Sequence, residues 1–126
     1  MSRLPLAFSL FFLVGLRTAS GSDWYTGEYE RCGEQTSTLE IVECVIELYD
    51  EWDARLNTIY QVALDAQEGE RRTALRDVQR AWLAYRDANC AFYRSGEGSI
   101  AAIEGNTCMF ALTRDRALEL EAVYGN

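Results

Sequence analysis

The stretch QRAWLAYRDANC, residues 79–90, decides the fold. Its aromatic residues Trp82 and Tyr85 lie three positions apart, so they share one face of a helix. An arginine–aspartate pair follows directly, and Cys90 ends the stretch. This pattern predicts a helix with an apolar face, a charged flank beside it and a covalent attachment to another part of the chain.

Working outward, the stretch is the middle of a longer amphipathic segment, and two other segments share its period. Their apolar residues recur at alternating steps of three and four, as in helices that pack on neighbouring helices. Ser37 followed by Glu40 is a capping box that begins the first helix, and Gly69 ends it. The repeating positions are Val42, Val45, Tyr49, Trp52, Leu56, Ile59 and Ala63, then Leu75, Val78, Trp82, Tyr85, Asn89 and Phe92, then Phe110, Thr113, Ala117, Leu120 and Tyr124.

Three such helices with short connections predict an all-α fold, a small antiparallel three-helix bundle. When the first two helices fold against each other, Asp53 lies level with Arg86, and Tyr60 lies level with Gln79. We therefore expect an Asp53–Arg86 ion pair and a Tyr60–Gln79 contact along one edge of the core. Arg116 flanks the third apolar seam, where its side chain can join a carboxylate or cap a carbonyl.

The first 21 residues have the layout of an export signal. Arg3 is followed by an apolar run over residues 4–16 that is too short to span a bilayer, and small residues follow at 19–21. We expect cleavage after Gly21. The domain division is then a signal peptide at 1–21, an irregular lead-in with room for a short helix at 22–36, and a helical domain at 37–126.

Four cysteines in a small exported chain indicate disulfides rather than a metal or redox site. The spacings are not those of a zinc site, and the chain has no histidine, so neither a metal nor a cofactor is expected. Four cysteines allow three pairings. We choose Cys32–Cys44 and Cys90–Cys108, because each pair is close in sequence and brackets a helix end.

The charge of the chain restricts its partners. The net charge is −8, and removal of residues 1–21 with Arg3 and Arg17 lowers it to −10. Such an excess of negative charge argues against nucleic acid and favours a basic protein partner. On the first helix, an acidic stripe faces outward and is a candidate surface for steering such a partner. Its members are Glu40, Glu43, Glu47, Asp50 and Glu51.

Catalysis has little support in the residues present. Without histidine, a serine or cysteine nucleophile has no imidazole base, and no glycine-rich phosphate loop precedes a helix. A hydrolase would have to use two carboxylates, either Glu97 with Glu104 or Asp53 with Asp87. A solvated face and a structural ion pair explain these residues better, so we expect no enzymatic activity.

The better functional candidate is the glycine-bearing segment at 95–106, which we expect to be a loop tethered by the second disulfide. A loop held at both ends loses less entropy on binding than a free one does. A plain connector is the competing interpretation. The residues expected to contact a partner here are Ser95, Gly96, Glu97, Gly98, Ser99, Ile100 and Glu104.

The order and spacing of these residues resemble the LprI-like lysozyme inhibitor domain, a small exported helical family. The matching positions cover roughly residues 32–120, and they are Cys44, Asp53, Leu56, Asn57, Tyr60, Gln79, Trp82, Tyr85, Arg86, Asp87, Cys90, the segment at 96–100, Cys108, Thr113, Arg116 and Leu120. We assign structural roles to Asp53, Asn57, Tyr60, Gln79, Trp82, Tyr85, Arg86, Asp87 and Arg116.

The resemblance implies a periplasmic or secreted, non-enzymatic domain that binds lysozyme and blocks its cleft. Lysozymes are typically basic, which suits an acidic partner. The alternative is an envelope interaction or structural module with a different protein partner, and the third hypothesis is a carboxylate-based hydrolase.

Overall fold

The computed structural model describes residues 23–126. The predicted signal peptide at 1–21 lies outside the described residues. All the regular elements of the described part are helices, which confirms the all-α class. In chain order they are the 3₁₀ helix η1 (Gly27–Tyr29) and the α-helices α1 (Glu30–Gly33), α2 (Thr38–Asp65), α3 (Gly69–Arg94) and α4 (Gly98–Tyr124).

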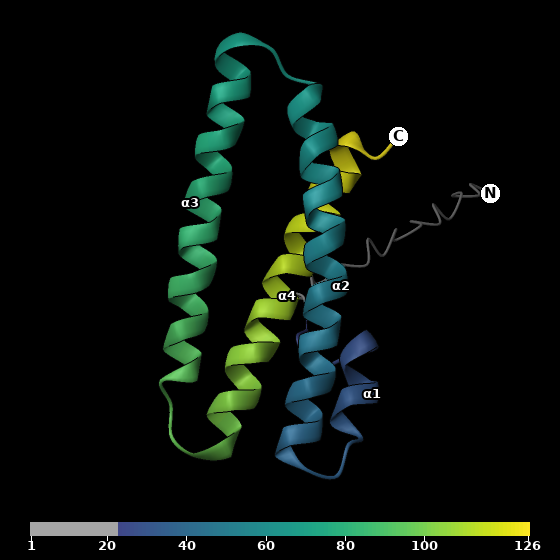
Figure 1. The fold of residues 1–126 in the computed structure, drawn as a ribbon, viewed down its shortest axis with the longest axis vertical. Coiled ribbons are helices and arrows are strands. Elements are labelled where there is room, and N and C mark those ends of the chain that lie inside the picture. The colour runs from purple at the N-terminus through teal and green to yellow at the C-terminus, as the bar shows by residue number, and fades with distance from the viewer. Residues whose placement is uncertain (1–22) are drawn as a thin grey trace, which may run out of the picture.

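The three long helices alternate in direction, and α4 runs diagonally between the other two (Figure 1). Helix α2 packs mainly on α4, and α3 also packs on α4, whereas α2 and α3 make few direct contacts. The expected bundle is therefore present, but the expectation that α2 and α3 pack closely along their length is wrong. Helix α4 separates them because it is long enough to run from the α3–α4 turn to the opposite end of the bundle.

The expected loop at 95–106 is wrong over most of its length, because α4 already begins at Gly98. Only residues 95–97 connect α3 to α4. Gly98 (φ 73°) and Gly69 (φ 55°) each begin a helix in a backbone conformation that favours glycine, so Gly69 opens α3 rather than ending α2. A Cβ on Gly105 would lie 2.9 Å from the Cβ of Arg94, so this glycine lets α3 and α4 approach closely.

The core lies between α2 and α4. The apolar seams expected on these two helices face it, although Val42, Tyr49 and Tyr124 are only partly buried. The seam expected on α3 is wrong at three positions, since Val78, Tyr85 and Phe92 are 53%, 57% and 71% exposed. The face that α3 turns to α4 instead contains Leu75, Gln79, Trp82, Arg86, Asn89, Cys90 and Tyr93.

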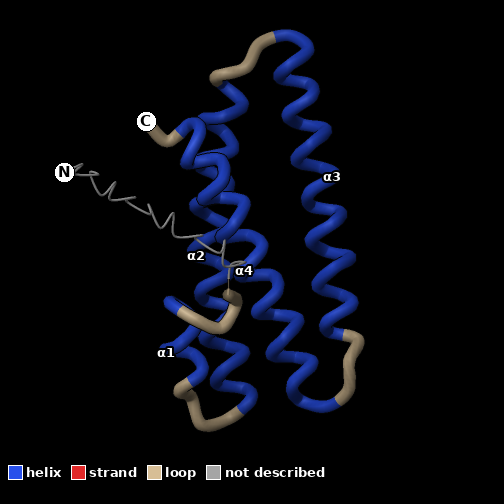
Figure 2. Tube along the Cα trace, turned by 180° about the vertical axis from the view of Figure 1, so that it is seen from behind, coloured by secondary structure: helices blue, strands red, loops and turns tan. Residues whose placement is uncertain are grey.

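Both expected disulfides are confirmed, with a Cα–Cα distance of 5.4 Å in each. Cys32–Cys44 joins α1 to the start of α2, and Cys90–Cys108 joins the last turns of α3 to α4. The α1–α2 and α3–α4 turns lie at the same end of the bundle (Figures 1 and 2), and Cys32 and Cys90 each lie within a few residues of one of them. We call this end, with its turns at 34–37 and 95–97, the stapled end.

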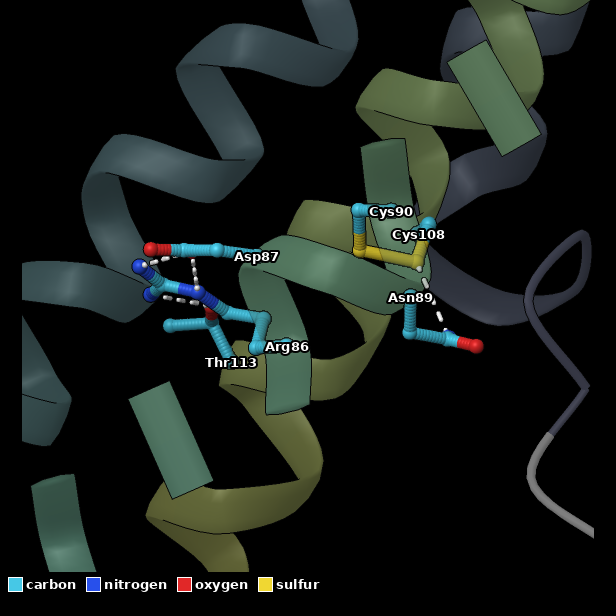
Figure 3. The surroundings of a disulfide bond; sticks show 6 residues. All are labelled: Arg86, Asp87, Asn89, Cys90, Cys108 and Thr113. Atoms are coloured by element: carbon cyan, nitrogen blue, oxygen red, sulfur yellow. Dashed lines mark hydrogen bonds and ion pairs between the residues drawn. A yellow bond between two sulfur atoms is a disulfide. The ribbon is translucent and has the colours of Figure 1, made fainter. Parts of the chain in front are cut away.

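Polar contacts line the seam between α3 and α4. Arg116 Nε donates to Gln79 Oε1 at 3.1 Å, and both side chains are buried. One turn from the disulfide, Arg86 donates to Thr113 Oγ1 at 3.4 Å, and Asn89 Nδ2 lies 3.5 Å from Cys108 Sγ (Figure 3). Most buried polar groups require such partners. On α4, however, Arg116 Nη2 and Thr107 Oγ1 are buried without a hydrogen-bond partner among the described residues.

The predicted Asp53–Arg86 ion pair does not occur among the ion pairs of residues 23–126. Arg86 instead pairs with its neighbour Asp87 at 3.0 Å (Figure 3) and lies 5.2 Å from the ring centre of Trp82. Asp53 accepts a long hydrogen bond of 3.5 Å from Asn57. The reason is the position of α4, which supplies Thr113 as the cross-helix partner of Arg86.

Tyr60 and Gln79 were predicted to be in contact. In the structure both line the same groove between α2 and α3. The amide oxygen of Gln79 is directed instead to Arg116 on α4.

We predict that replacing both cysteines of either disulfide by serine lowers the free energy of unfolding by about 3 kcal/mol. Without the disulfide, the unfolded chain recovers the conformational entropy that closing a loop of this length had removed. The loops span 12 and 18 residues, so the two variants should lose similar amounts. Urea unfolding followed by circular dichroism measures the loss. A loss below about 1 kcal/mol in both variants would contradict this account.

We also predict that Gln79→Leu costs about 1–3 kcal/mol, since it leaves the buried Arg116 Nε without its acceptor. Arg80→Ala is the matched control on the same helix. The Arg80 side chain is 79% exposed and only 3.8 Å from Asp77 in a loose ion pair, so its loss should change stability by less than about 0.5 kcal/mol. Equal losses in the two variants, measured by urea unfolding, would show that the buried contact contributes nothing.

Candidate functional site

The residues expected to contact a partner lie on the stapled end. Residues 95–100 are all exposed, with Ile100 at 55%, and Glu104 is partly exposed. Beyond Ile100 the segment is less available, because Ala101, Ile103 and Gly105 face the interior. The exposed part is therefore the tight turn at 95–97 together with the first turn of α4.

This turn is held rigidly, although it is not the tethered loop that we expected. The amide of Ser95 donates to the carbonyl oxygens of Ala91 and Phe92, and its hydroxyl donates to the latter at 2.7 Å. The amide of Gly96 donates to the carbonyl oxygen of Tyr93 at 3.4 Å. The Cys90–Cys108 disulfide joins the two helices just behind the turn. A surface fixed in this way loses little conformational entropy when it binds.

The acidic stripe on α2 is exposed at all five positions, but its members have different roles. Glu40 accepts hydrogen bonds from the hydroxyl of Thr36 and from the amide and hydroxyl of Ser37. The Thr36 hydroxyl, followed by Ser37, lowers the pKa of Glu40 below its ordinary value, so Glu40 acts in the confirmed capping box. Glu51 lies 3.8 Å from Arg31.

The remaining carboxylates of the stripe, Glu43, Glu47 and Asp50, form no ion pair within the described part of the chain. Their charges are therefore not neutralised by an ion pair within residues 23–126.

An aromatic cluster at the stapled end was missed by the sequence reasoning. The Trp24 ring packs edge-on against Tyr93 at 5.1 Å between centroids, and Tyr25 packs against Tyr29 at 5.0 Å. Burial and then the charge of Glu104 raise the pKa of Tyr25, which places this carboxylate beside the cluster. The signal was present in the sequence as DWYTGEY at 23–29, within the segment that we expected to be an irregular lead-in.

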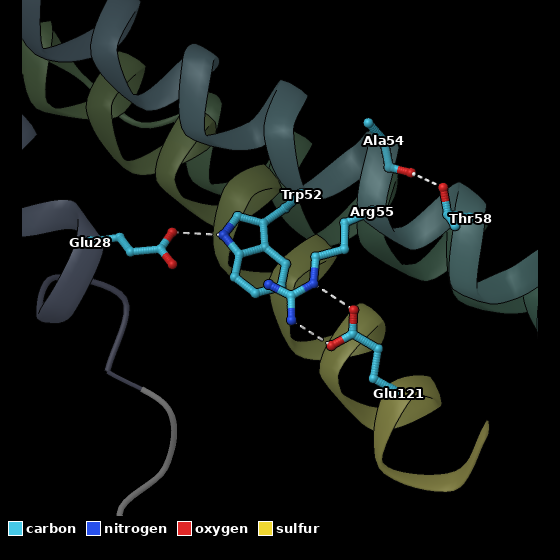
Figure 4. A network of polar contacts seen from close by, with 6 residues as sticks. All are labelled: Glu28, Trp52, Ala54, Arg55, Thr58 and Glu121. Carbon is cyan, nitrogen blue, oxygen red and sulfur yellow. Dashed lines mark hydrogen bonds and ion pairs between the residues drawn. The ribbon is translucent and has the colours of Figure 1, made fainter. Parts of the chain in front are cut away.

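A second polar network joins the N-terminal segment to α2 and α4. Glu28 accepts a 2.7 Å hydrogen bond from the Trp52 indole, and the Arg55 guanidinium lies 4.4 Å from the same ring (Figure 4). Arg55 also makes two hydrogen bonds to the carboxylate of Glu121. A shallow groove of about 580 Å³ runs beside this pair. Since each charged group here already has a partner in the chain, the network is best explained as structural.

Of the four carboxylates weighed as hydrolase candidates, three have structural partners or neighbours. Asp87 is paired with Arg86, Asp53 accepts from Asn57, and Glu104 lies beside Tyr25. Glu97 is the N-cap residue of α4, but its side chain accepts no capping hydrogen bond. Within residues 23–126 there is also no group of three or more side chains suited to hold a metal ion.

Comparison with known proteins identifies relatives of this chain. The family model described as "Lysozyme inhibitor LprI" matches residues 30–120. An uncharacterised protein of Rhizobium meliloti (strain 1021) is 29% identical over 105 residues, which is 71% of this chain and 76% of that protein. No solved structure is significantly similar to the chain. None of the helices between residues 23 and 126 has the length and hydropathy needed to cross a bilayer.

The family match covers α1, α2, α3 and most of α4. It therefore includes both disulfides, the polar seam between α3 and α4, and the turn at the stapled end. The chain belongs to the LprI lysozyme inhibitor family.

Proposed function

We propose that this protein binds a lysozyme and blocks its substrate cleft with the stapled end. Family membership supports lysozyme as the partner, and the family is a class of inhibitors rather than of enzymes. The observation that carries the proposal is the rigid, exposed turn at 95–97 with the first turn of α4. In this segment a disulfide behind the turn, a tight turn and exposed contact residues coincide.

The turn suits insertion into a cleft. Gly96 and Gly98 carry no side chains, so the backbone can approach an opposing surface closely. Ile100 is an apolar residue that is mostly exposed and sits at the start of a rigid helix. Apolar anchors of this kind, surrounded by polar groups, carry much of the binding energy of protein interfaces.

The mechanism that we propose is occlusion and needs no chemistry from the inhibitor. The turn would occupy the space that a polysaccharide chain takes when it lies across the catalytic carboxylates of a muramidase. Tyr25 and Glu104 would lie at the side of this contact, where a phenol and a carboxylate can hydrogen-bond to backbone and basic groups. The oligosaccharide substrate would be excluded by volume.

The acidic stripe contributes at longer range. A net charge of −10 after signal removal attracts a basic protein, and Glu43, Glu47 and Asp50 concentrate part of that charge on the exposed face of α2. Complementary charge of this kind raises the rate of association more than it raises affinity. The helices α2, α3 and α4 are then the scaffold that holds both surfaces.

We place the encounter with the proposed partner outside the cytoplasm, because features of this protein indicate that location. Its two disulfides and its family both indicate an extracytoplasmic protein. We further propose that residues 1–21 direct export to the periplasm or the medium.

The first prediction from this function concerns Ile100. Ile100→Ala should weaken lysozyme inhibition about tenfold or more, because the variant removes the apolar anchor while leaving an exposed helical alanine that is compatible with the fold. Val123→Ala is the matched control, since Val123 is 64% exposed on the same helix but at the opposite end. Residual lysozyme activity on bacterial cell walls, measured by turbidity against inhibitor concentration, gives both values.

If the unmodified protein leaves lysozyme activity unchanged at a stoichiometric excess and low salt, the proposed function is wrong. Co-purification with a different envelope protein in that case would favour the interaction-module alternative. Equal losses in Ile100→Ala and Val123→Ala would refute the placement of the contact at the stapled end.

The second prediction concerns the acidic stripe. Glu43→Gln/Glu47→Gln should lower the association rate with lysozyme severalfold at low salt and leave the dissociation rate nearly unchanged, because these charges act before contact. Glu68→Gln/Glu70→Gln removes the same charge near the opposite turn and should have a smaller effect. Surface-based kinetic measurements at several salt concentrations distinguish the two. A matched decrease in both variants would assign the effect to net charge alone.

A further inference from the structure

Helix α3 has a second apolar face that the other helices of residues 23–126 leave exposed. At alternating steps of four and three, it exposes a stripe of apolar residues beside the face that packs on α4. Val78, Tyr85 and Phe92 in this stripe are 53%, 57% and 71% exposed. The stripe consists of Ala74, Val78, Ala81, Tyr85, Ala88 and Phe92, and all six are exposed.

The position of α3 leaves this face accessible. Both views of the fold show α3 at the edge of the bundle, with α4 alongside and no helix on its outer side (Figures 1 and 2). A soluble helix usually shows one apolar face, and a second one at coiled-coil spacing indicates another helix as a partner. From Ala74 to Phe92 the stripe extends about 27 Å along the helix.

Large and small residues alternate along the stripe. The large ones are Val78, Tyr85 and Phe92, each seven residues apart, and alanines stand four residues before each of them. Beside Ala74, a small groove of about 190 Å³ opens between α3 and the end of α4, with Leu75, Val78 and Tyr124 among its lining residues. One end of the stripe therefore offers a protruding aromatic ring, and the other end offers an apolar recess.

We propose that two copies of this chain associate through α3, antiparallel, about a two-fold axis beside Leu83. In this arrangement Ala74 faces the partner's Phe92, Val78 faces the partner's Ala88, and Ala81 faces the partner's Tyr85. Each large side chain lies opposite a small one, and each Phe92 enters the groove beside Ala74 of the other copy. The interface is self-complementary, as a two-fold dimer requires.

Charge selects the antiparallel direction. Helix α3 carries six arginines and three acidic residues, so in this acidic protein it is a basic element. Arg71 lines the groove and donates to Gln67, and it has no ion pair within the described chain. In the antiparallel arrangement Arg71 lies opposite the partner's turn at 95–97, which carries the exposed Glu97. In a parallel arrangement Arg71 would instead face Arg71 of the second copy, and the two like charges would repel each other.

Sedimentation equilibrium of the purified protein over a range of concentrations tests the proposal. The unmodified protein should fit a monomer–dimer equilibrium. Phe92→Ala removes the ring and Ala74→Phe fills the recess, so each should raise the dimer Kd about tenfold or more. Ile100→Ala is the matched control, because Ile100 is a comparably exposed apolar residue outside the stripe and should leave the dimer Kd unchanged. Circular dichroism confirms that each variant is folded.

A charge exchange tests the direction of the helices. Arg71→Glu and Glu97→Arg should each weaken the dimer, and the double variant should recover most of the loss, because each end then carries the opposite charges. Both side chains are exposed, so neither change threatens the fold. A protein that remains monomeric at its highest soluble concentration would overturn the proposal, whatever other protein it captures. So would a dimer that is insensitive to Phe92→Ala, or a double variant weaker than both single ones.

This assay contains no lysozyme, so its outcome is independent of the proposed inhibitory function. If both proposals hold, a second copy and a lysozyme compete for the side chain of Glu97.

Discussion

The close approach of α3 to α4 at the stapled end is the constraint on which the rest of the structure depends. Cys90–Cys108 joins the two helices covalently, and Gly105 allows the backbone of α4 to lie against Arg94 where a side chain would collide. With this crossing fixed, α4 leaves the turn at an angle that carries it between α3 and α2 (Figure 1). The α2–α4 core and the α3–α4 polar seam both follow from that path.

The two faces of α4 are stabilised in different ways. Toward α2 it presents apolar residues such as Phe110 and Leu120, and burial of these side chains drives the packing. Toward α3 it presents Thr113 and Arg116, which are paired with Arg86 and Gln79. Such polar contacts add little net stability but are costly to break, so they favour one register of α3 over others. The interface between α3 and α4 thus fixes the register of α3 through polar contacts and buries few apolar side chains.

A helix attached in this way keeps much of its own apolar surface. The polar seam and the exposed stripe have the same origin, which is the orientation of α3. Gln79 and Arg86 face the interior of the bundle, so Val78 and Tyr85 face outward. The stapled end has a complementary character, because the disulfides fix its backbone and its surface carries exposed carboxylates. The protein thus has one rigid acidic end and one apolar edge, and these two surfaces underlie the two proposals made for it.

The sequence by itself determined the helical class, both disulfide pairs, the capping box at Ser37 and the inward faces of α2 and α4. These depend on local spacing, on proximity along the chain and on one clear apolar stripe per helix. It also indicated the family and the exposed residues at 95–100, although their structure was expected to be a loop.

The tertiary structure alone decided the partner of each helix, the inward face of α3 and the end of the α3–α4 turn. Helix α3 contains two adjacent stripes with the same period, and spacing does not show which one another helix covers. Glycine lowers helix propensity by about 1 kcal/mol, so Gly98 and Gly105 argued for a loop. Packing overrode that preference because the crossing with α3 requires a residue without a side chain at Gly105. Arg86 donates to Thr113 and not to the expected Asp53, because α4 lies beside α3 where α2 was expected.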